Sequence, residues 1–141
     1  MGKHIVVIQG HPDLNTRHFG HALAEAYIRG LTEAKFEYRL IEVAKLDFPV
    51  LRSKDDFDNG KPIACIEEAQ QAIVWADHII LFYPLWLGTL PAYLQAFFEQ
   101  VFRPGFAFDR PQEGNNKWKK HLEGKTAHIV VTMGMPAFVY R

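Results

Sequence analysis

The sequence has few of the features that mark secreted, membrane-spanning or nucleic-acid-binding proteins. Cys65 is its only cysteine, so no disulfide can form within the chain, which fits a reducing compartment. No apolar run approaches the roughly 20 residues that a membrane-spanning helix needs. Lysine plus arginine and aspartate plus glutamate are balanced at 16 each, which leaves no basic field to hold nucleic acid. We expect a cytoplasmic protein with no membrane span and no nucleic-acid partner.

Several catalytic motifs are also missing. The first predicted strand is followed neither by a G-x-G-x-x-G pattern nor by a phosphate-loop lysine. The seven histidines are scattered, and His18 with His21 is only an i,i+3 pair, so no metal site is expected. Cys65 has no basic neighbour in sequence that would activate its thiol as a nucleophile.

The 141 residues, 48% of them hydrophobic, suit one globular domain. Hydrophobic spacing predicts strands at residues 5–9, 36–43, 78–83 and 126–133, and helices at 17–29, 63–76 and 92–102. We expect Gly30 to end the first helix as its C′ residue and the polar segment 46–62 to be a long surface loop. The alternation of strand and helix predicts an α/β fold with a doubly wound sheet.

The pattern within the strands indicates a parallel sheet. Residues 5–8, 79–82 and 129–131 are continuous apolar runs, typical of strands covered on both faces, and His128 is then expected to be a core histidine. Residues 36–41 partly alternate, as in an outer strand. The loops that follow parallel strands meet at one edge of the sheet, where open α/β sheets bind their ligands.

The loop after the third predicted strand is the most informative segment. Residues 83–91 read YPLWLGTLP, an apolar and aromatic stretch between two prolines with one glycine. A solvated turn is usually rich in Asn, Asp and Ser. The composition favours a surface that lies against a flat apolar ligand; the alternative is packing into the core or against a partner subunit.

The loop after the first strand, residues 9–19, offers Asn15 or Thr16 as a helix N-cap and places Arg17 and His18 in the first helical turn. Free backbone N–H groups, the positive helix end and basic side chains predict an anion site, most naturally for phosphate; an ordinary cap is the alternative. The loop after the fourth strand adds Thr132, Met133 and Gly134. Together the three loops describe a cradle for flavin mononucleotide.

With these residues placed, the chain resembles the flavodoxin-like NAD(P)H:quinone oxidoreductase family. The stretches that carry the resemblance are residues 10–19, 22–26, 82–88, 98–102, 105–108 and 132–134. The matches at 82–88 and 105–108 are specific, and the first loop is looser. The resemblance implies a flavodoxin-like doubly wound parallel sheet, with residues 1–141 forming a single domain.

The resemblance also implies the chemistry. Bound FMN or FAD passes a hydride from NAD(P)H to a quinone-like acceptor, and the active sites lie at the interface of a homodimer. Tyr140 is the candidate for stabilising charge on the ring or the quinone. The cofactor-binding residues implied are His11, Arg17, His18, Phe19, Pro84, Leu85, Trp86, Leu87, Gly88, Thr132, Met133 and Gly134.

The chain departs from the family pattern at its C-terminal end. Family members continue with a fifth strand and a closing helix, so the domain is expected to be incomplete there. The edge of the fourth predicted strand then lacks a partner, which favours self-association. The alternatives to an enzyme are a non-catalytic binding or regulatory subunit, an electron carrier, and a fragment without turnover. The zero net charge speaks against a flavodoxin-type carrier, which is commonly acidic.

Overall fold

The computed structural model describes residues 3–111 and 117–140, apart from the side chains of residues 137 and 140. Within this part of the chain, four parallel strands form one sheet in the order β2-β1-β3-β6. The strands are β1 (Ile5–Gln9), β2 (Tyr38–Glu42), β3 (His78–Pro84) and β6 (Thr126–Thr132). The helices are α1 (Phe19–Glu33), α2 (Lys54–Asn59), α3 (Ala64–Trp75) and α4 (Ala92–Val101), with 3-10 turns η1 (Val43–Lys45) and η2 (Ala137–Tyr140).

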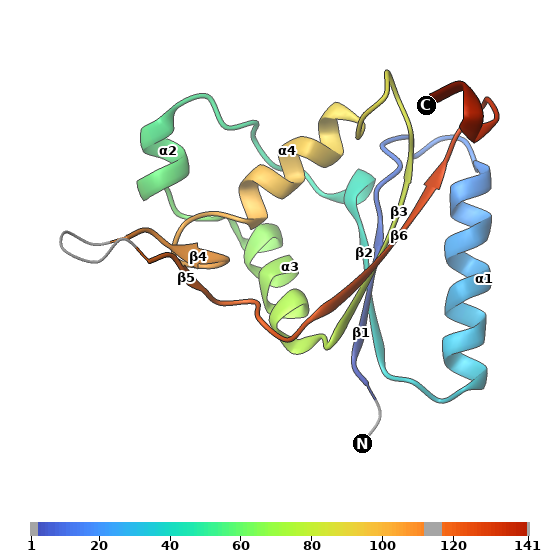
Figure 1. The fold of residues 1–141 in the computed structure, drawn as a ribbon, viewed down its shortest axis with the longest axis horizontal. Coiled ribbons are helices and arrows are strands. Elements are labelled where there is room, and N and C mark those ends of the chain that lie inside the picture. The colour runs from blue at the N-terminus through green and yellow to red at the C-terminus, as the bar shows by residue number, and fades with distance from the viewer. Residues whose placement is uncertain (1–2, 112–116, 141) are drawn as a thin grey trace.

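Alternation along the central strand β1 divides the core into two layers. Val6 and Ile8 point to one face, where they join a cluster with residues of α3 and α4. Ile5 and Val7 point to the other face and pack with α1. Figure 1 shows the result, with α1 on one side of the sheet and α3 and α4 on the other. The predicted doubly wound α/β architecture is confirmed.

The strand order decides where a site can form. All four strands run in the same direction, so the loops after β1, β3 and β6 leave the same edge of the sheet (Figure 1). Gly10 lets the first of these loops approach its neighbours closely. A Cβ on Gly10 would lie 2.6 Å from Cδ2 of Leu94 and 3.1 Å from the carbonyl oxygen of Phe82. Its own N–H donates to that oxygen at 2.7 Å.

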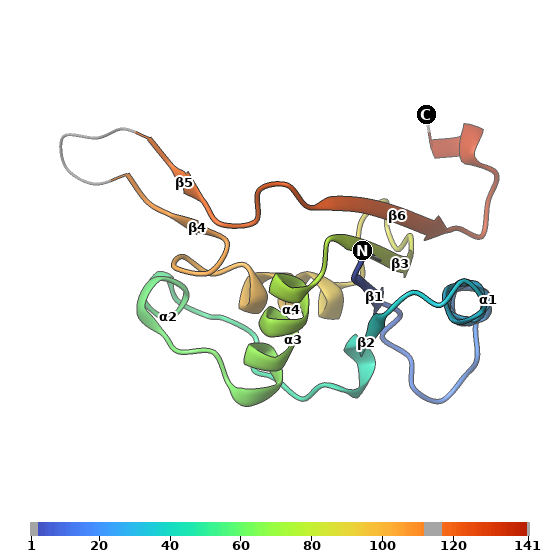
Figure 2. The same ribbon diagram turned by 90° about the horizontal axis from the view of Figure 1, so that it is seen from below.

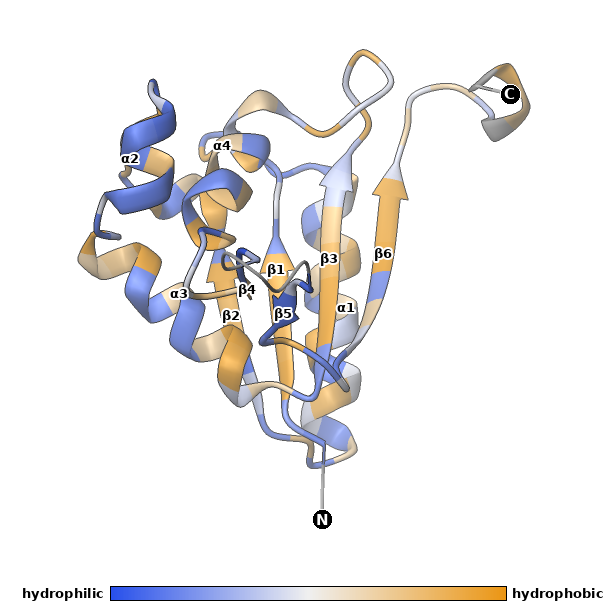
Figure 3. Cartoon of the chain, turned by 60° about the vertical axis from the view of Figure 1, so that its left-hand side comes forward, coloured by the Kyte–Doolittle hydropathy of each residue, from blue (hydrophilic) through white to orange (hydrophobic). Residues whose placement is uncertain are grey.

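Strand β6 is apolar but poorly covered. It forms the outer edge of the sheet (Figure 3), and no described element pairs with its free edge. Ile129 is 56% exposed, and His128 is exposed as well. The expectations that this strand is covered on both faces and that His128 is a core residue are therefore wrong. An apolar run predicts burial, but burial also requires a neighbouring element on each face.

Helix α1 continues past the predicted end. Gly30 lies inside the helix, and the chain adopts the left-handed conformation only at Lys35, with φ of 58°. The N–H of Lys35 donates to the carbonyl of Thr32 and that of Phe36 to the carbonyl of Leu31, which closes the last turn. The prediction that Gly30 is the C′ residue is wrong.

The expected long loop also contains regular structure. Within residues 46–62, the side chain of Ser53 accepts from the N–H of Asp56 and caps the short helix α2. A hairpin of β4 (Phe108–Asp109) and β5 (Lys119–Lys120) was not predicted; it extends away from the sheet (Figure 2). Across residues 3–111 and 117–140, no helix is long and apolar enough to cross a bilayer.

Candidate functional site

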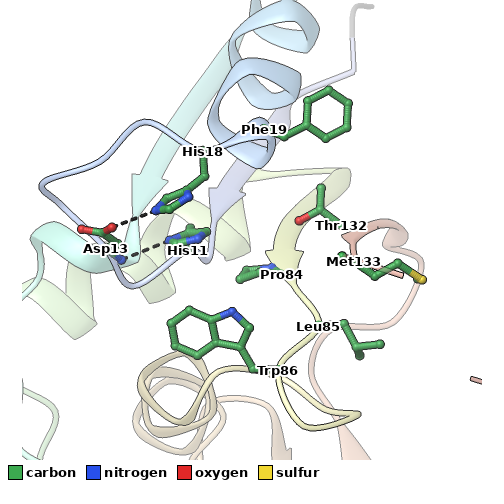
Figure 4. Close-up of a pocket in the computed structure, with 10 residues that line it drawn as sticks. His11, Asp13, His18, Phe19, Pro84, Leu85, Trp86, Thr132 and Met133 are labelled. Carbon is green, nitrogen blue, oxygen red and sulfur yellow. Dashed lines mark hydrogen bonds and ion pairs between the residues drawn. The ribbon is translucent and has the colours of Figure 1, made fainter. Parts of the chain in front are cut away.

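The three loops at the carboxyl edge of the sheet enclose a cavity of about 640 Å³ (Figure 4). Its volume lies in the range of small-molecule sites, about 300–1,000 Å³. One wall comes from the loop after β3, a second from the loop after β6, and a polar end from the loop after β1. The lining residues are His11, Asp13, His18, Phe19, Pro84, Leu85, Trp86, Thr132, Met133 and Gly134.

The first loop is held by its own polar side chains. The N–H of His11 donates to Oε1 of Gln9 at 2.9 Å, and the N–H of Asp13 donates to Nδ1 of His11 at 3.1 Å. The N–H of Asn15 donates to the carboxylate of Asp13 at 2.8 Å, as in an Asx turn. His11 is only 5% exposed. These bonds fix the backbone of the loop and the orientation of the His11 ring.

Three histidine rings gather at the polar end of the cavity. His11 stacks on His18 with 4.0 Å between ring centroids, and His21 lies 5.1 Å from His11. Burial and the neighbouring histidines lower the pKa of His11 below its usual range. Nε2 of His18 contacts the carboxylate of Asp13 at 2.8 Å, and this bond is the main reason why the pKa of Asp13 falls to about 2. Asp13 is therefore ionised at neutral pH.

Helix α1 begins later than the sequence suggests. Its N-cap is His18 in extended conformation, and the N–H of His18 donates to Nδ1 of His21 at 3.0 Å. The prediction of Asn15 or Thr16 as the N-cap is wrong, because the Asp13 turn already uses that part of the loop. The N–H groups of Phe19 and Gly20 have no acceptor among the described residues. Such groups bind anions well.

The wall from the loop after β3 is apolar and rigidly placed. The N–H of Leu85 donates to the carbonyl of Thr132 at 2.8 Å, which ties this loop to the end of β6. Trp86 and Thr89 exchange two backbone hydrogen bonds of 3.0 Å each. The indole of Trp86 meets the ring of His11 edge-on, with 5.7 Å between centroids. The aromatic wall therefore continues into the polar end.

Most of the predicted site residues come together, three do not, and the side chain of a fourth lies outside the described part of the structure. Leu87 and Gly88 form the tip of their turn, with φ of 50° and 78°, outside the cavity lining; Leu87 is fully exposed. Arg17 precedes the helix, lines an adjoining cavity of about 310 Å³ and forms an ion pair with Glu25. The backbone of Tyr140 lies in η2, but its side chain lies outside the described part of the structure.

Sequence reasoning missed the parts played by Asp13 and His21. Asp13 follows a proline, where a turn is expected, but nothing in the sequence indicates that its carboxylate reaches His18 five residues later. The i,i+3 spacing of His18 and His21 is visible in the sequence. It does not reveal that the N–H of His18 donates to Nδ1 of His21. Among the described residues, no group of three His, Cys, Asp or Glu side chains is placed to hold a metal ion.

The family of the chain follows from comparison with known proteins. A family model described as having a flavodoxin-like fold matches residues 3–141. The chain belongs to this flavodoxin-like family. The match covers almost the whole chain, and the four-stranded parallel sheet flanked by helices agrees with it.

Two curated relatives match the flavodoxin-like chain. A ribosyldihydronicotinamide dehydrogenase-like protein of Penicillium crustosum is 32% identical over 72 residues, which are 48% of this chain and 27% of that protein. An uncharacterized NAD(P)H oxidoreductase of Haemophilus influenzae is 27% identical over 139 residues, 96% of this chain and 67% of that protein. The chain thus spans about a quarter of the first relative's length and about two thirds of the second's.

Solved structures share the fold at lower identity. The NAD(P)H:quinone oxidoreductase of Methanothermobacter marburgensis superposes with a TM-score of 0.79 at 23% identity, over 99% of this chain and 71% of that one. The FMN-dependent NADH-azoreductase of Bacillus anthracis, solved with FMN, has a TM-score of 0.71 at 13% identity, over 94% of this chain and 69% of that one. At these identities the likeness concerns the fold.

Proposed function

We propose that the protein is a flavin-dependent oxidoreductase that moves a hydride from NAD(P)H, through bound FMN or FAD, to a quinone-like acceptor. One observation carries the proposal: a single cavity at the carboxyl edge of the sheet joins an apolar aromatic wall to an end with free hydrogen-bond donors. The names of the relatives, which include NAD(P)H oxidoreductases and an FMN-dependent enzyme, support it.

The residues present fit a flavin. Pro84, Leu85 and Trp86 give the lining an apolar surface, and Met133 adds an adaptable side chain to it. The N–H groups of Phe19 and Gly20, which have no acceptor in the described part of the chain, would receive a phosphate at the other end.

The chain's own residues would bind the flavin, orient its ring and shield it from water. The flavin, when bound, supplies the hydride chemistry. Trp86 would fix the tilt of the ring, because its backbone is held by the Thr89 hydrogen bonds and its indole contacts the ring of His11. Thr132 lies beside Gly20 and lines the cavity, so its hydroxyl can donate a hydrogen bond to a bound molecule.

We also propose a homodimer that completes the site. Large apolar side chains are exposed on the loops that line the cavity and on the segment after β6, and such an exposed apolar rim is typical of a surface that meets another subunit. Phe19 is 70% exposed. The other exposed members of this rim are Trp86, Leu87, Met133, Met135 and Phe138. Sedimentation at micromolar concentration tests the proposal, and a strictly monomeric species would contradict it.

The test of function starts with flavin uptake. We expect the purified protein to bind added FMN or FAD with a change in absorbance near about 450 nm, to bleach with NAD(P)H and to recover its colour with a quinone. Trp86→Ala should weaken flavin affinity about tenfold through lost ring contact. Val74→Ala is the control, because this exposed side chain of α3 belongs neither to the cavity lining nor to the apolar rim, and should leave affinity within about twofold.

Three outcomes would contradict the proposal. A preparation that takes up neither FMN nor FAD is not a flavoenzyme. Bleaching by an external reductase but not by NADH or NADPH would favour an electron carrier, and bound flavin that no reductant reaches would favour a binding subunit.

A further inference from the structure

The charged side chains that face the two cavities are already paired. Arg17 forms an ion pair with Glu25, and Lys45 contacts Glu42 at 2.6 Å. With Asp13, the linings hold two cations and three carboxylates, which leaves one net negative charge while the histidines are neutral. A phosphate monoester carries close to two negative charges at neutral pH. Among the described residues, the lining supplies no free cation to balance it.

Two of the histidines are held as neutral donors. Nδ1 of His11 accepts the N–H of Asp13 at 3.1 Å, and Nδ1 of His21 accepts the N–H of His18 at 3.0 Å. A nitrogen that accepts an N–H bond carries no proton, so the ring proton of each lies on Nε2. Protonating either ring would break its loop bond. Nε2 of His11 has no partner among the described residues, although the side chain is almost fully buried and lines both cavities.

His18 differs from both. Its Nε2 bonds to the carboxylate of Asp13, which accepts and cannot donate. A positive charge on this ring is stabilised by the carboxylate of Asp13. His18 also lines the first cavity and stacks on His11 with 4.0 Å between centroids (Figure 4). It is the position in the stack where an added proton is best accommodated.

We propose that the site binds a phosphate monoester together with one proton from solvent, which His18 takes up while His11 donates from Nε2 as a neutral ring. This inference rests on the proposed function and names the chemistry of its phosphate end. Asp13 lines both cavities, and its carboxylate repels an anion. The positive charge on His18 offsets the negative charges of both the phosphate and Asp13. Proton uptake replaces the unpaired arginine or lysine that phosphate sites commonly use.

The first experiment compares FMN with riboflavin, which has the same ring and no phosphate. Because the complex holds one more proton than the free protein, FMN affinity should be several-fold weaker at pH 8 than at pH 6.5. Riboflavin affinity should stay constant. The phosphate's own protonation, near pH 6, works in the opposite direction on affinity and is minor over this range. Calorimetry in two buffers with different ionisation enthalpies should count about one proton taken up by the complex with FMN.

Substitutions of His18 and Asp13 separate the effect of charge on FMN binding from the effect of structure. His18→Asn keeps a residue that caps helices well and removes the protonatable ring, so the FMN profile should become flat within about twofold. Asp13→Asn keeps the ring and removes the carboxylate that stabilises its charge, so the profile should also flatten, with tighter binding at pH 8. A pH profile for FMN that is the same in the wild-type protein and in His18→Asn would overturn the inference.

Inorganic phosphate tests the inference without flavin. In a histidine NMR titration, phosphate should raise the midpoint of His18 and should not raise that of His11. If flavin does not bind but phosphate still raises this midpoint, the proposed function fails and the inference holds. If FMN binds with no proton uptake and phosphate leaves His18 unchanged, the inference fails and the proposed function holds.

Discussion

Alanine at position 30 distinguishes the observed course of α1 from the one that the sequence suggests. In the structure Gly30 is an exposed residue of regular helix, and a Cβ there meets no atom within 4 Å. Alanine loses less backbone entropy than glycine when a helix forms, so Gly30→Ala should stabilise the fold by about 0.5–1 kcal/mol. If Gly30 were the left-handed C′ residue, the same change would be destabilising.

Urea denaturation followed by far-ultraviolet circular dichroism measures the effect. With an m value of about 2 kcal/mol per molar urea, the expected gain raises the midpoint by about 0.3–0.5 M. Gly10→Ala is the contrasting variant, because its Cβ would lie 2.6 Å from a side-chain carbon of the buried Leu94. Overpacking of this kind costs about 1–3 kcal/mol, so the midpoint should fall. A lower midpoint for Gly30→Ala would refute the description of α1.

Two further substitutions test other parts of the structure. Arg103 is buried and donates to Oε1 of Gln100 at 2.6 Å. Arg103→Ala leaves this buried acceptor unpaired and should lower the free energy of unfolding by about 2–3 kcal/mol, with little recovery in Arg103→Lys. Equal urea midpoints for the wild-type protein and the variants would contradict this. The folded-state pKa of Asp13, about 2, lies below its ordinary 3.8, so its bond to His18 stabilises the fold above pH 3.8 and is lost as pH falls through about 2. Asp13→Asn should therefore flatten the acid dependence of stability in that window, as measured by urea titrations at each pH.

The sequence was most informative where a segment is buried by its own neighbours. Residues 79–82 form a continuous apolar run, and β3 lies between β1 and β6 with helices on both faces. The partly alternating segment after α1 forms β2 at the edge, as predicted. In these strands the hydrophobic pattern and the environment agree, so position and type could be predicted, with boundaries within a few residues.

Prediction failed where the environment depends on distant elements. The run 129–131 is continuously apolar like the run in β3, yet Ile129 is exposed because no described element covers it. The hairpin of β4 and β5 pairs only two residues on each strand, which is too short for a periodic signal. Helix α2 is six residues long and polar, so neither an apolar stripe nor its length distinguishes it from a loop.

The candidate site likewise has features that the sequence predicts and features that depend on the folded structure. That the three loops meet could be inferred from parallel topology alone, since carboxyl ends of parallel strands share an edge. The state of charge within the site could not be inferred. Arg17 counts as a cation for an anion in the sequence, but Glu25, eight residues on, pairs with it across the start of α1.

Loss of that cation changes the electrostatics of the predicted phosphate end. An arginine is charged at every physiological pH, whereas an imidazole is charged only when it has taken a proton. Moving the positive charge from Arg17 to His18 therefore turns an anion site of constant strength into one whose strength depends on pH. The distinction depends on hydrogen-bond direction at Nδ1 of His11 and on one contact between His18 and Asp13, and only the folded arrangement of the loop determines both.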